Sequence, residues 1–324
     1  MAKYKDIGGT TVRFSSGAEE YTYPSGAEGS LYYNSANGNF EFVGLGTGSW
    51  ASGGNLNTAR RLLGGAGTQT AGLAFGGNPA SLAITEEYDG TSWTESGDLN
   101  LGRRYVAGAG TQTAAIAMAG YDDPSPSGYT ADAETYNGSS WTEITDLNTA
   151  RANNQASAGT QTAAVTFGGN NPGAIALTEE WDGSSWTESG DLNTARSDFA
   201  GCGQQTEALA FGGRESPATT EAYNGSTWTA GNDLNTGRYT LTGSGNSAPL
   251  ALAIGGNGDV AITEQFDGTS WTEVADMSTA RDQLSSAVQS GVGATAAFGG
   301  HTSDNVANTE EWTIVHAIKT VTTS

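Results

Sequence analysis

A six-fold internal repeat is the feature of this sequence that most restricts its fold. Six tryptophans recur at intervals of 42 to 48 residues, and an arginine follows each of them at a fixed distance of ten residues. The tryptophans are Trp50, Trp93, Trp141, Trp186, Trp228 and Trp271, and the arginines are Arg60, Arg103, Arg151, Arg196, Arg238 and Arg281. An invariant spacing across six units indicates one structural unit that is repeated six times.

Each unit has two further landmarks between its arginine and the next tryptophan. A pair of small residues follows the arginine after an apolar run such as Leu209–Phe211. The pairs are Gly76-Gly77, Ala119-Gly120, Gly168-Gly169, Gly212-Gly213, Gly255-Gly256 and Gly299-Gly300, and the aromatic residues that come next are Tyr88, Tyr136, Trp181, Tyr223, Phe266 and Trp312. The unit therefore predicts four short strands: strand a after the arginine, strand b in the apolar run, strand c with the aromatic residue and strand d with the tryptophan.

The turns between strands c and d strengthen this interpretation. Five units place an Asx-Gly pair between the aromatic residue and the tryptophan, as in Asn224-Gly225. Because Asn and Gly tolerate positive φ, such pairs are typical of tight β-hairpins. Four strands in each unit of about 40 to 50 residues are typical of propeller blades. The sequence predicts an all-β fold, a six-bladed β-propeller.

The order of these residues resembles a known repeat. Arginine, apolar run, small pair, tyrosine and tryptophan follow one another as in the Kelch motif, and the segment from Arg196 to Trp228 matches it best. The resemblance covers roughly residues 50–312 and implies a Kelch-like propeller. Ala119-Gly120 and the aromatic residues Trp181, Phe266 and Trp312 depart from the motif without disturbing the spacing.

The two ends of the repeat predict how the ring closes. The last unit has an arginine, a small pair and an aromatic residue, but no later Asx-Gly pair and no later tryptophan, whereas Trp50 has no unit before it. We expect the segment around Trp50 to supply strand d of the last blade, which would leave no open sheet edge. The alternative is that Ile314–Val321 forms this strand.

The repeated residues have structural and functional interpretations. The tryptophans are expected to fill the wedge between neighbouring blades; an aromatic ring that binds sugar is the alternative. Six glutamates stand two residues before the aromatic positions, and we expect each to form an ion pair with an arginine of the repeat. They are Glu86, Glu134, Glu179, Glu221, Glu264 and Glu310.

Charge and composition disfavour several function classes. The chain of 324 residues has 35 acidic and 13 basic residues and a formal net charge of −22. Such a surface repels phosphate backbones and anionic lipids, so we expect no nucleic acid as partner and no membrane insertion. The sequence has no stretch long and apolar enough to span a bilayer, and its first residues lack the apolar core of a secretory signal.

Enzymatic chemistry is poorly represented in the sequence. The single cysteine, Cys202, excludes an intrachain disulfide and is expected to be a small buried residue of strand a, and the two histidines are His301 and His316. We expect no enzyme activity, no catalytic residues, no cofactor and no metal site. Asp122-Asp123 could form a carboxylate pair or a weak Ca²⁺ site, although adjacent acids in such a loop are more often solvated.

The connections between strands b and c are the best candidates for a binding surface. Unlike the nearly uniform a–b and c–d turns, they vary in length and sequence, and Tyr121–Ala133 is the longest. Variation on one face of a rigid scaffold is the usual layout for recognition, although variable loops can also reflect drift alone. The candidate residues for binding a ligand or partner are Tyr121, Asp122, Asp123, Tyr129, Asn170, Asn171, Arg214, Asn257 and His301.

The first 44 residues lie outside the repeat. Gly29–Val43 predicts a hairpin with an Asn37-Gly38 turn, and this segment is similar to short modules near the N-termini of bacteriophage fibre proteins. The repeats themselves, with Asp-Gly-Thr-Ser-Trp-Thr-Glu and Leu-Asn-Thr-Ala-Arg, also resemble propellers of phage virion proteins. We therefore expect residues 1–44 to attach or oligomerise and residues 45–324 to form the propeller.

Three functional hypotheses follow. The first is a non-enzymatic virion protein of a bacteriophage, such as a fibre, decoration or receptor-binding module. It would be a homo-oligomer that contacts other virion proteins through residues 1–44 and a glycan or protein of the host surface through its b–c loops. The second is a bacterial Kelch-like module that binds glycans or proteins, either extracellular or cytoplasmic. The third, which the sequence favours least, is a hydrolase or lyase that uses loop carboxylates.

Overall fold

The computed structural model describes residues 13–15, 31–34, 39–44, 48–123, 128–152, 156–247, 250–314 and 317–320. The regular secondary structure of these residues consists of β-strands, and no helix occurs among them. The chain divides into two compact units. One comprises Ser49–Thr313, and the other comprises Met1–Gly48 together with Ile314–Ser324.

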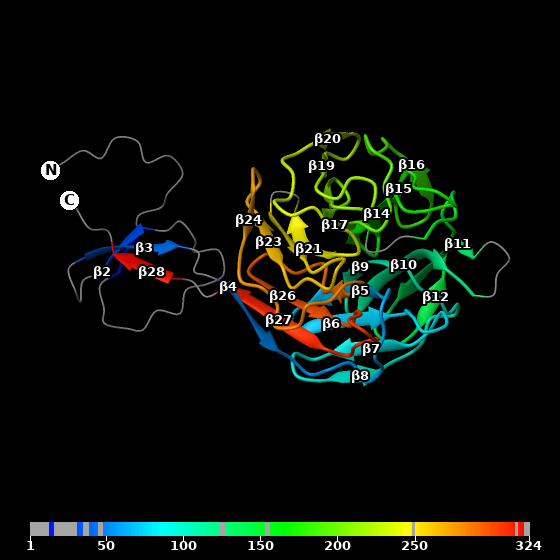
Figure 1. Ribbon diagram of the computed structural model, residues 1–324, viewed down its shortest axis with the longest axis horizontal. Coiled ribbons are helices and arrows are strands. Elements are labelled where there is room, and N and C mark those ends of the chain that lie inside the picture. The colour runs from blue at the N-terminus through cyan, green and yellow to red at the C-terminus, as the bar shows by residue number, and fades with distance from the viewer. Residues whose placement is uncertain are drawn as a thin grey trace. The chain divides into compact units, whose positions relative to one another are not determined.

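The unit Ser49–Thr313 is a six-bladed β-propeller, which confirms the predicted fold (Figure 1). Each blade is a four-stranded antiparallel sheet, and blades 1 to 5 each use four consecutive strands. The inner strands a and b are β5 (Gly64–Thr68) and β6 (Ala71–Phe75), β9 (Ala107–Thr111) and β10 (Ala114–Tyr121), β13 (Ser157–Thr160) and β14 (Ala163–Phe167), β17 (Ala200–Gln204) and β18 (Glu207–Phe211), and β21 (Thr242–Ser247) and β22 (Leu250–Ile254). The outer strands c and d are β7 (Thr85–Tyr88) and β8 (Trp93–Glu95), β11 (Tyr129–Tyr136) and β12 (Trp141–Glu143), β15 (Thr178–Trp181) and β16 (Trp186–Glu188), β19 (Thr220–Tyr223) and β20 (Trp228–Ala230), and β23 (Thr263–Phe266) and β24 (Trp271–Glu273).

Blade 6 combines strands from both ends of the unit. It contains β25 (Ser285–Ser286), β26 (Ala294–Phe298) and β27 (Thr309–Ile314), and its outer strand is β4 (Gly48–Ser52). Figure 1 shows β4 in blue beside β27 in red. The Trp50 ring lies 5.5 Å from the Trp312 ring, and the Trp50 indole N–H donates to Thr263 Oγ1 in blade 5 at 3.1 Å.

The second unit contains a four-stranded sheet with the order β1-β2-β3-β28. Its strands are β1 (Arg13–Ser15), β2 (Leu31–Asn34), β3 (Asn39–Gly44) and β28 (Ala317–Thr320). Strands β2 and β3 pair antiparallel from Leu31↔Phe42 to Asn34↔Asn39, as the predicted hairpin requires, although the Asn37-Gly38 turn itself lies outside the described residues. Because β28 pairs with β3 rather than with a blade, the propeller ends before the expected residue 324.

The glycine-rich a strands form the inner ring of the propeller. Each a strand contacts the a strands of its neighbours, from β5 and β9 around to β25 and β5. A Cβ atom added at Gly108 of blade 2 would lie 2.4 Å from the carbonyl oxygen of Gly65 in blade 1. Side chains larger than hydrogen do not fit at such positions, which explains the small residues of these strands.

All six expected Arg–Glu ion pairs are present within their blades, and all are buried. The N–O distances are 3.0 Å for Arg103–Glu134, 3.1 Å for Arg238–Glu264 and 3.5 Å for Arg281–Glu310, and the other pairs are Arg60–Glu86, Arg151–Glu179 and Arg196–Glu221. Burial lowers the pKa of each arginine, in Arg281 to about 10, and the negative charge of the paired glutamate opposes this effect.

Additional hydrogen bonds satisfy most polar atoms of the buried pairs, although the Nε atoms of five of the six arginines have no partner among the described residues. Arg196 Nη1 donates to the carbonyl oxygens of Gly212 at 3.2 Å and Thr219 at 2.8 Å. The carboxylate of Glu221 accepts from both the backbone and the side-chain amide of Asn193, each at 2.7 Å. The Leu-Asn-Thr-Ala-Arg segment thus supplies several donors to one glutamate, which compensates the desolvation of the buried ion pair.

The small pairs connect each blade to the next. The backbone N–H of the second residue donates to the carbonyl oxygen of the arginine in the following blade, as from Gly213 to Arg238 at 3.1 Å and from Gly300 of blade 6 to Arg60 of blade 1 at 2.9 Å. At the first residue, Gly212 has a φ of +73°, and a Cβ there would lie 2.6 Å from the Arg238 carbonyl oxygen. Glycine suits both the dihedral angle and the close approach at Gly212, whereas blade 2 has Ala119 with a φ of 57° at the equivalent position.

The tryptophans also act between blades. Trp228 packs on Phe167 of blade 3 with ring centroids 4.7 Å apart, and its indole N–H donates to Thr178 Oγ1 of the same blade at 3.0 Å. Five of the six tryptophans donate an indole N–H hydrogen bond to a threonine hydroxyl of the preceding blade. The exception is Trp186, because the threonine position of blade 2 holds Ala133, and its indole instead donates to the carbonyl oxygen of Thr145.

The uniform a–b turns are a further link between blades. The glutamine of each Gly-Thr-Gln-Thr turn donates to backbone carbonyls of the preceding blade, as from Gln112 to Gly72 at 3.0 Å and to Tyr88 at 2.7 Å. Gln69 and Gln161 make the equivalent contacts, as does Gln205 of the related turn Gly203-Gln204-Gln205-Thr206. Gln69 makes this link between blades 1 and 6. The a–b turns of blades 5 and 6 have other sequences. Among the described residues, the glutamine link is therefore missing between blades 4 and 5 and between blades 5 and 6.

None of the residues that the structure describes belongs to a helix with the length and apolar character needed to cross a bilayer.

The tryptophan–threonine bonds predict a measurable contribution to stability. Trp271 donates to Thr220 Oγ1 at 3.0 Å in a buried environment. Replacement of Thr220 by Val keeps the shape but leaves the indole N–H without an acceptor, so we expect a loss of about 1–3 kcal/mol in the free energy of unfolding, measured by chemical denaturation. Thr229→Val, at an exposed position of β20, is the control and should change stability by less than about 0.5 kcal/mol. Equal effects of both substitutions would contradict the role of the bond.

Candidate functional site

The b–c loops begin at a structurally equivalent position in all six blades. The first residue after each small pair forms backbone hydrogen bonds with the residue that directly follows the arginine of the repeat, as from Tyr121 to Arg104 at 2.7 Å. We call these residues the rim pairs: Arg61–Asn78, Arg104–Tyr121, Ala152–Asn170, Ser197–Arg214, Tyr239–Asn257 and Asp282–His301. The main chain is therefore fixed at the rim while the side chains differ in every blade.

A series of four backbone hydrogen bonds between neighbouring blades lies directly beside the rim pairs. Tyr105 N–H donates to the Leu62 carbonyl at 2.8 Å, and the same bond runs from Leu62 to Gln283, from Gln283 to Thr240 and from Thr240 to Asp198. All five residues have φ between 52° and 56°, although none is glycine. Such strained conformations persist only where the surroundings hold them, and they are frequent at functional sites.

The rim gathers most of the residues that the sequence singled out. Tyr121, Asn170, Arg214, Asn257 and His301 are members of rim pairs, and Asp122, Asp123 and Asn171 follow them directly. The sequence did not single out their partners Arg104, Tyr239 and Asp282, nor the pair Arg61–Asn78. The sequence feature that could have indicated these partners is the residue after each invariant arginine, which changes from one unit to the next.

An aromatic and charged cluster lies between blades 2 and 3. The rings of Tyr121 and Tyr129 meet edge to face at 5.5 Å, and the Arg104 guanidinium lies 4.9 Å from the Tyr121 ring centroid. Arg104 also forms an ion pair with Asp123 at 2.7 Å, and the Tyr129 hydroxyl donates to Asn170 Oδ1 at 3.0 Å. Asp123 is thus engaged with an arginine, which leaves little support for a Ca²⁺ site at Asp122-Asp123.

The expected loop Tyr121–Ala133 is shorter than predicted, because Tyr121 belongs to β10 and residues 129–133 belong to β11, while residues 124–127 lie outside the described residues. Strands β10 and β11 continue their pairing through Gly120↔Thr130 to Tyr121↔Tyr129. The register shifts between Met118 and Gly120, where Ala119 has a φ of 57°. A bulge at this position lets the hairpin extend beyond the length of its counterparts and carry Tyr129 towards blade 3.

A second cluster lies between blades 4 and 5. Arg214, whose side chain is 55% exposed, forms an ion pair with Asp198 at 2.8 Å. Its guanidinium lies 4.5 Å from the centroid of the Tyr239 ring. Asn257 Oδ1 accepts the Tyr239 backbone N–H at 2.8 Å, which holds this part of the rim in place.

The charges of the propeller are divided between its interior and its rim. Residues 48–314 contain nine arginines and no lysine. Six arginines are buried in the repeated ion pairs, and the other three, Arg61, Arg104 and Arg214, all belong to rim pairs. In this strongly acidic chain, the accessible positive charge of the described propeller is therefore confined to one face.

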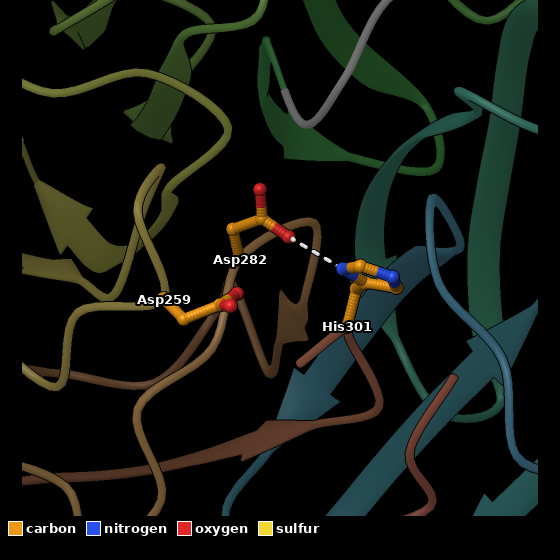
Figure 2. Close-up of side chains that lie close together, drawn as sticks. All are labelled: Asp259, Asp282 and His301. Atoms are coloured by element: carbon orange, nitrogen blue, oxygen red, sulfur yellow. Dashed lines mark ion pairs between the residues drawn. The ribbon is translucent and has the colours of Figure 1, made fainter. Parts of the chain in front are cut away.

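The sixth rim pair forms a separate polar cluster, shown in Figure 2. His301 Nδ1 lies 3.7 Å from Asp282 Oδ1, and Asp259 reaches the same place from the b–c loop of blade 5. Asp282 Oδ2 accepts hydrogen bonds from Thr240 Oγ1 and Gln283 Nε2, both at 3.3 Å. Burial raises the pKa of Asp282, while the hydrogen bonds and His301 partly oppose this effect.

A pocket of about 500 Å³ opens on the opposite face, between blades 4 and 5. Its lining includes Glu207, Tyr223, Phe266 and Thr269. At the boundary of blades 3 and 4, Gln205 donates a hydrogen bond to the carbonyl oxygen of Trp181 at 2.7 Å. Trp181 holds the same position in blade 3 as Tyr223 does in blade 4. Blade 5 has no glutamine in its a–b turn, and none of the described residues makes the equivalent contact with the carbonyl of Tyr223.

No protein-family model matches this chain, and no curated protein matches its sequence. Arguments about function therefore rest on the geometry of the propeller and its rim.

Cys202 provides a test of the inner ring. Its side chain is 1% exposed in β17, and burial raises the pKa of its thiol to about 12. Because the thiolate is the reactive form, we expect no measurable reaction of the native protein with a thiol reagent such as DTNB at pH 8 within an hour. One equivalent should react at once after denaturation, which is the internal control. A fast reaction of the native protein would show that strand a of blade 4 is accessible.

Proposed function

We propose that this protein is a non-enzymatic recognition module that binds a glycan or protein on a host surface through the rim of its propeller. The observation that carries this proposal is the set of six rim pairs, which share one backbone geometry and differ in their side chains. Rigid positions with variable side chains suit a surface whose ligand specificity changes while the fold stays constant.

The chemistry of the rim favours a polar ligand. Tyr121, Tyr129 and Tyr239 offer amphipathic rings, Arg104 and Arg214 offer forked donors, and Asn170 offers an amide, which together suit the hydroxyl, acetamido or carboxylate groups of a saccharide. Tyrosine and arginine are also the residues that contribute most at protein interfaces. The glycan is the preferred ligand, and a protein surface is the second candidate.

We further propose that the module belongs to a bacteriophage virion, as a fibre, decoration or receptor-binding component. The resemblance of the repeats to Kelch-like propellers of phage proteins supports this assignment, as does the N-terminal segment. A separate compact unit built from both ends of the chain offers a part for attachment to other virion proteins or for oligomerisation. Several copies would turn weak contacts at each rim into strong overall binding. The alternative is a bacterial Kelch-like binding module without connection to a virus.

Rim substitutions test the recognition role. We expect the fluorescently labelled full chain to bind at least one ligand on a glycan array or on bacterial cells. Tyr121→Ala and Arg214→Ala should each weaken that binding by at least about tenfold, because tyrosine and arginine are frequent binding hot spots. Thr187→Ala, at an exposed position of the outer strand β16, is the control and should bind as the wild type does.

Unfolding midpoints of all variants would verify that each is folded before binding is compared. Binding that survives both rim substitutions unchanged would contradict recognition through the rim. Mass spectrometry of purified phage particles tests the virion assignment separately, and absence of the protein from the particles would favour the bacterial alternative.

A further inference from the structure

The cluster at the boundary of blades 5 and 6 combines three metal-binding side chains. Asp259 lies between β22 and β23, Asp282 lies between β24 and β25, and His301 follows β26. One donor atom from each residue lies within 4.8 Å of the other two. In Figure 2 the three side chains converge on one place from separate segments of the chain.

The cluster is held in position before any ligand arrives. Asp282 and His301 exchange two backbone hydrogen bonds, of 3.1 and 2.8 Å. The bonds from Thr240 and Gln283 hold Asp282 Oδ2, so the other oxygen, Oδ1, is directed towards His301. A site whose ligands are already oriented binds a metal ion without a large loss of conformational entropy.

One oxygen of the cluster lacks the partner that its burial requires. Asp282 Oδ1 is buried and accepts no hydrogen bond from the residues that the structure describes, and the side chain as a whole is 14% exposed. A buried carboxylate oxygen without a donor is costly, and a second carboxylate nearby adds repulsion. A bound cation would remove both penalties. None of the other five rim pairs contains a carboxylate.

We propose that Asp259, Asp282 and His301 bind a divalent transition-metal ion such as Zn²⁺ or Mn²⁺. One imidazole nitrogen and two carboxylate oxygens suit these ions better than Ca²⁺, which prefers six to eight oxygen ligands. Small side-chain rotations would bring the donors to the roughly 2.0–2.2 Å expected for metal–ligand bonds. Asp259 is exposed, so water can complete the coordination.

The position of this site gives the ion a structural role. Asp259 belongs to blade 5, whereas His301 belongs to blade 6, so the ion joins two blades. This boundary lacks the glutamine link of the a–b turns, because the turn before Ala294 contains Val292 at the equivalent place. Strand a of blade 6 is also the shortest of the six, with only Ser285–Ser286. The metal ion adds a link at the rim to a boundary whose a strands are already joined by hydrogen bonds such as that from Ser286 Oγ to the Gly243 carbonyl at 2.8 Å.

Calorimetric titration of the full chain, freed of metal by chelation, tests the proposal. We expect about one Zn²⁺ or Mn²⁺ ion to bind per chain, to raise the unfolding midpoint, and to bind more tightly than Ca²⁺. His301→Ala and Asp259→Asn should each weaken binding by at least about tenfold and abolish the shift of the midpoint. Asp304→Asn, an exposed acidic position in the same b–c loop as His301, is the control and should bind as the wild type does.

The chain has two histidines, so NMR of the imidazole nitrogens gives a second readout. We expect Zn²⁺ to shift the resonances that disappear in His301→Ala. Absence of binding at 1 mM ion, full retention of binding in both cluster variants, or equally tight binding of Ca²⁺ would each overturn the proposal. Unfolding midpoints of the metal-free variants would verify that loss of binding does not reflect loss of the fold.

Discussion

The buried arginine of each repeat is the interaction on which the propeller depends. Its guanidinium pairs with a glutamate of its own blade, and its carbonyl oxygen accepts a hydrogen bond from the small pair of the preceding blade. A charge placed in the interior is tolerated when an opposite charge and hydrogen bonds compensate most of its desolvation. The same residue therefore secures the internal order of one blade and its attachment to the next, and this arrangement recurs six times around the ring.

The rim is a consequence of this arrangement. The residues that flank the arginine and the small pair satisfy each other through backbone hydrogen bonds, which are indifferent to side-chain identity. Their side chains are thus free to vary, and the sequence uses this freedom differently in each blade: arginine with tyrosine in blade 2, serine with arginine in blade 4, and aspartate with histidine in blade 6. The arginine of each repeat thus contributes to stability, and the residue directly after it contributes a variable side chain to the rim.

The sequence predicted the features that repeat and missed those that do not. The spacing of Trp93, Arg103 and their counterparts was sufficient for six blades, and the matching number of glutamates was sufficient for the ion pairs. Arg104 and Asp282 were overlooked because positions that change in every unit give no periodic signal. The extension of β10 and β11 depends on a bulge at Ala119, and the pairing of β28 with β3 joins segments outside the repeat; neither can be derived from local patterns.

A double-mutant cycle at Arg196 and Glu221 tests the central role of the buried ion pair most directly. Arg196→Ala and Glu221→Ala should each lower the free energy of unfolding by about 3–5 kcal/mol, because each leaves an unpaired buried charge. The double variant should lose far less than the sum of the two. The exposed pair Arg214 and Asp198 is the reference, with an expected coupling of at most about 1 kcal/mol. Losses at Arg196 and Glu221 that simply add, or that are as small as those at the exposed pair, would contradict the account.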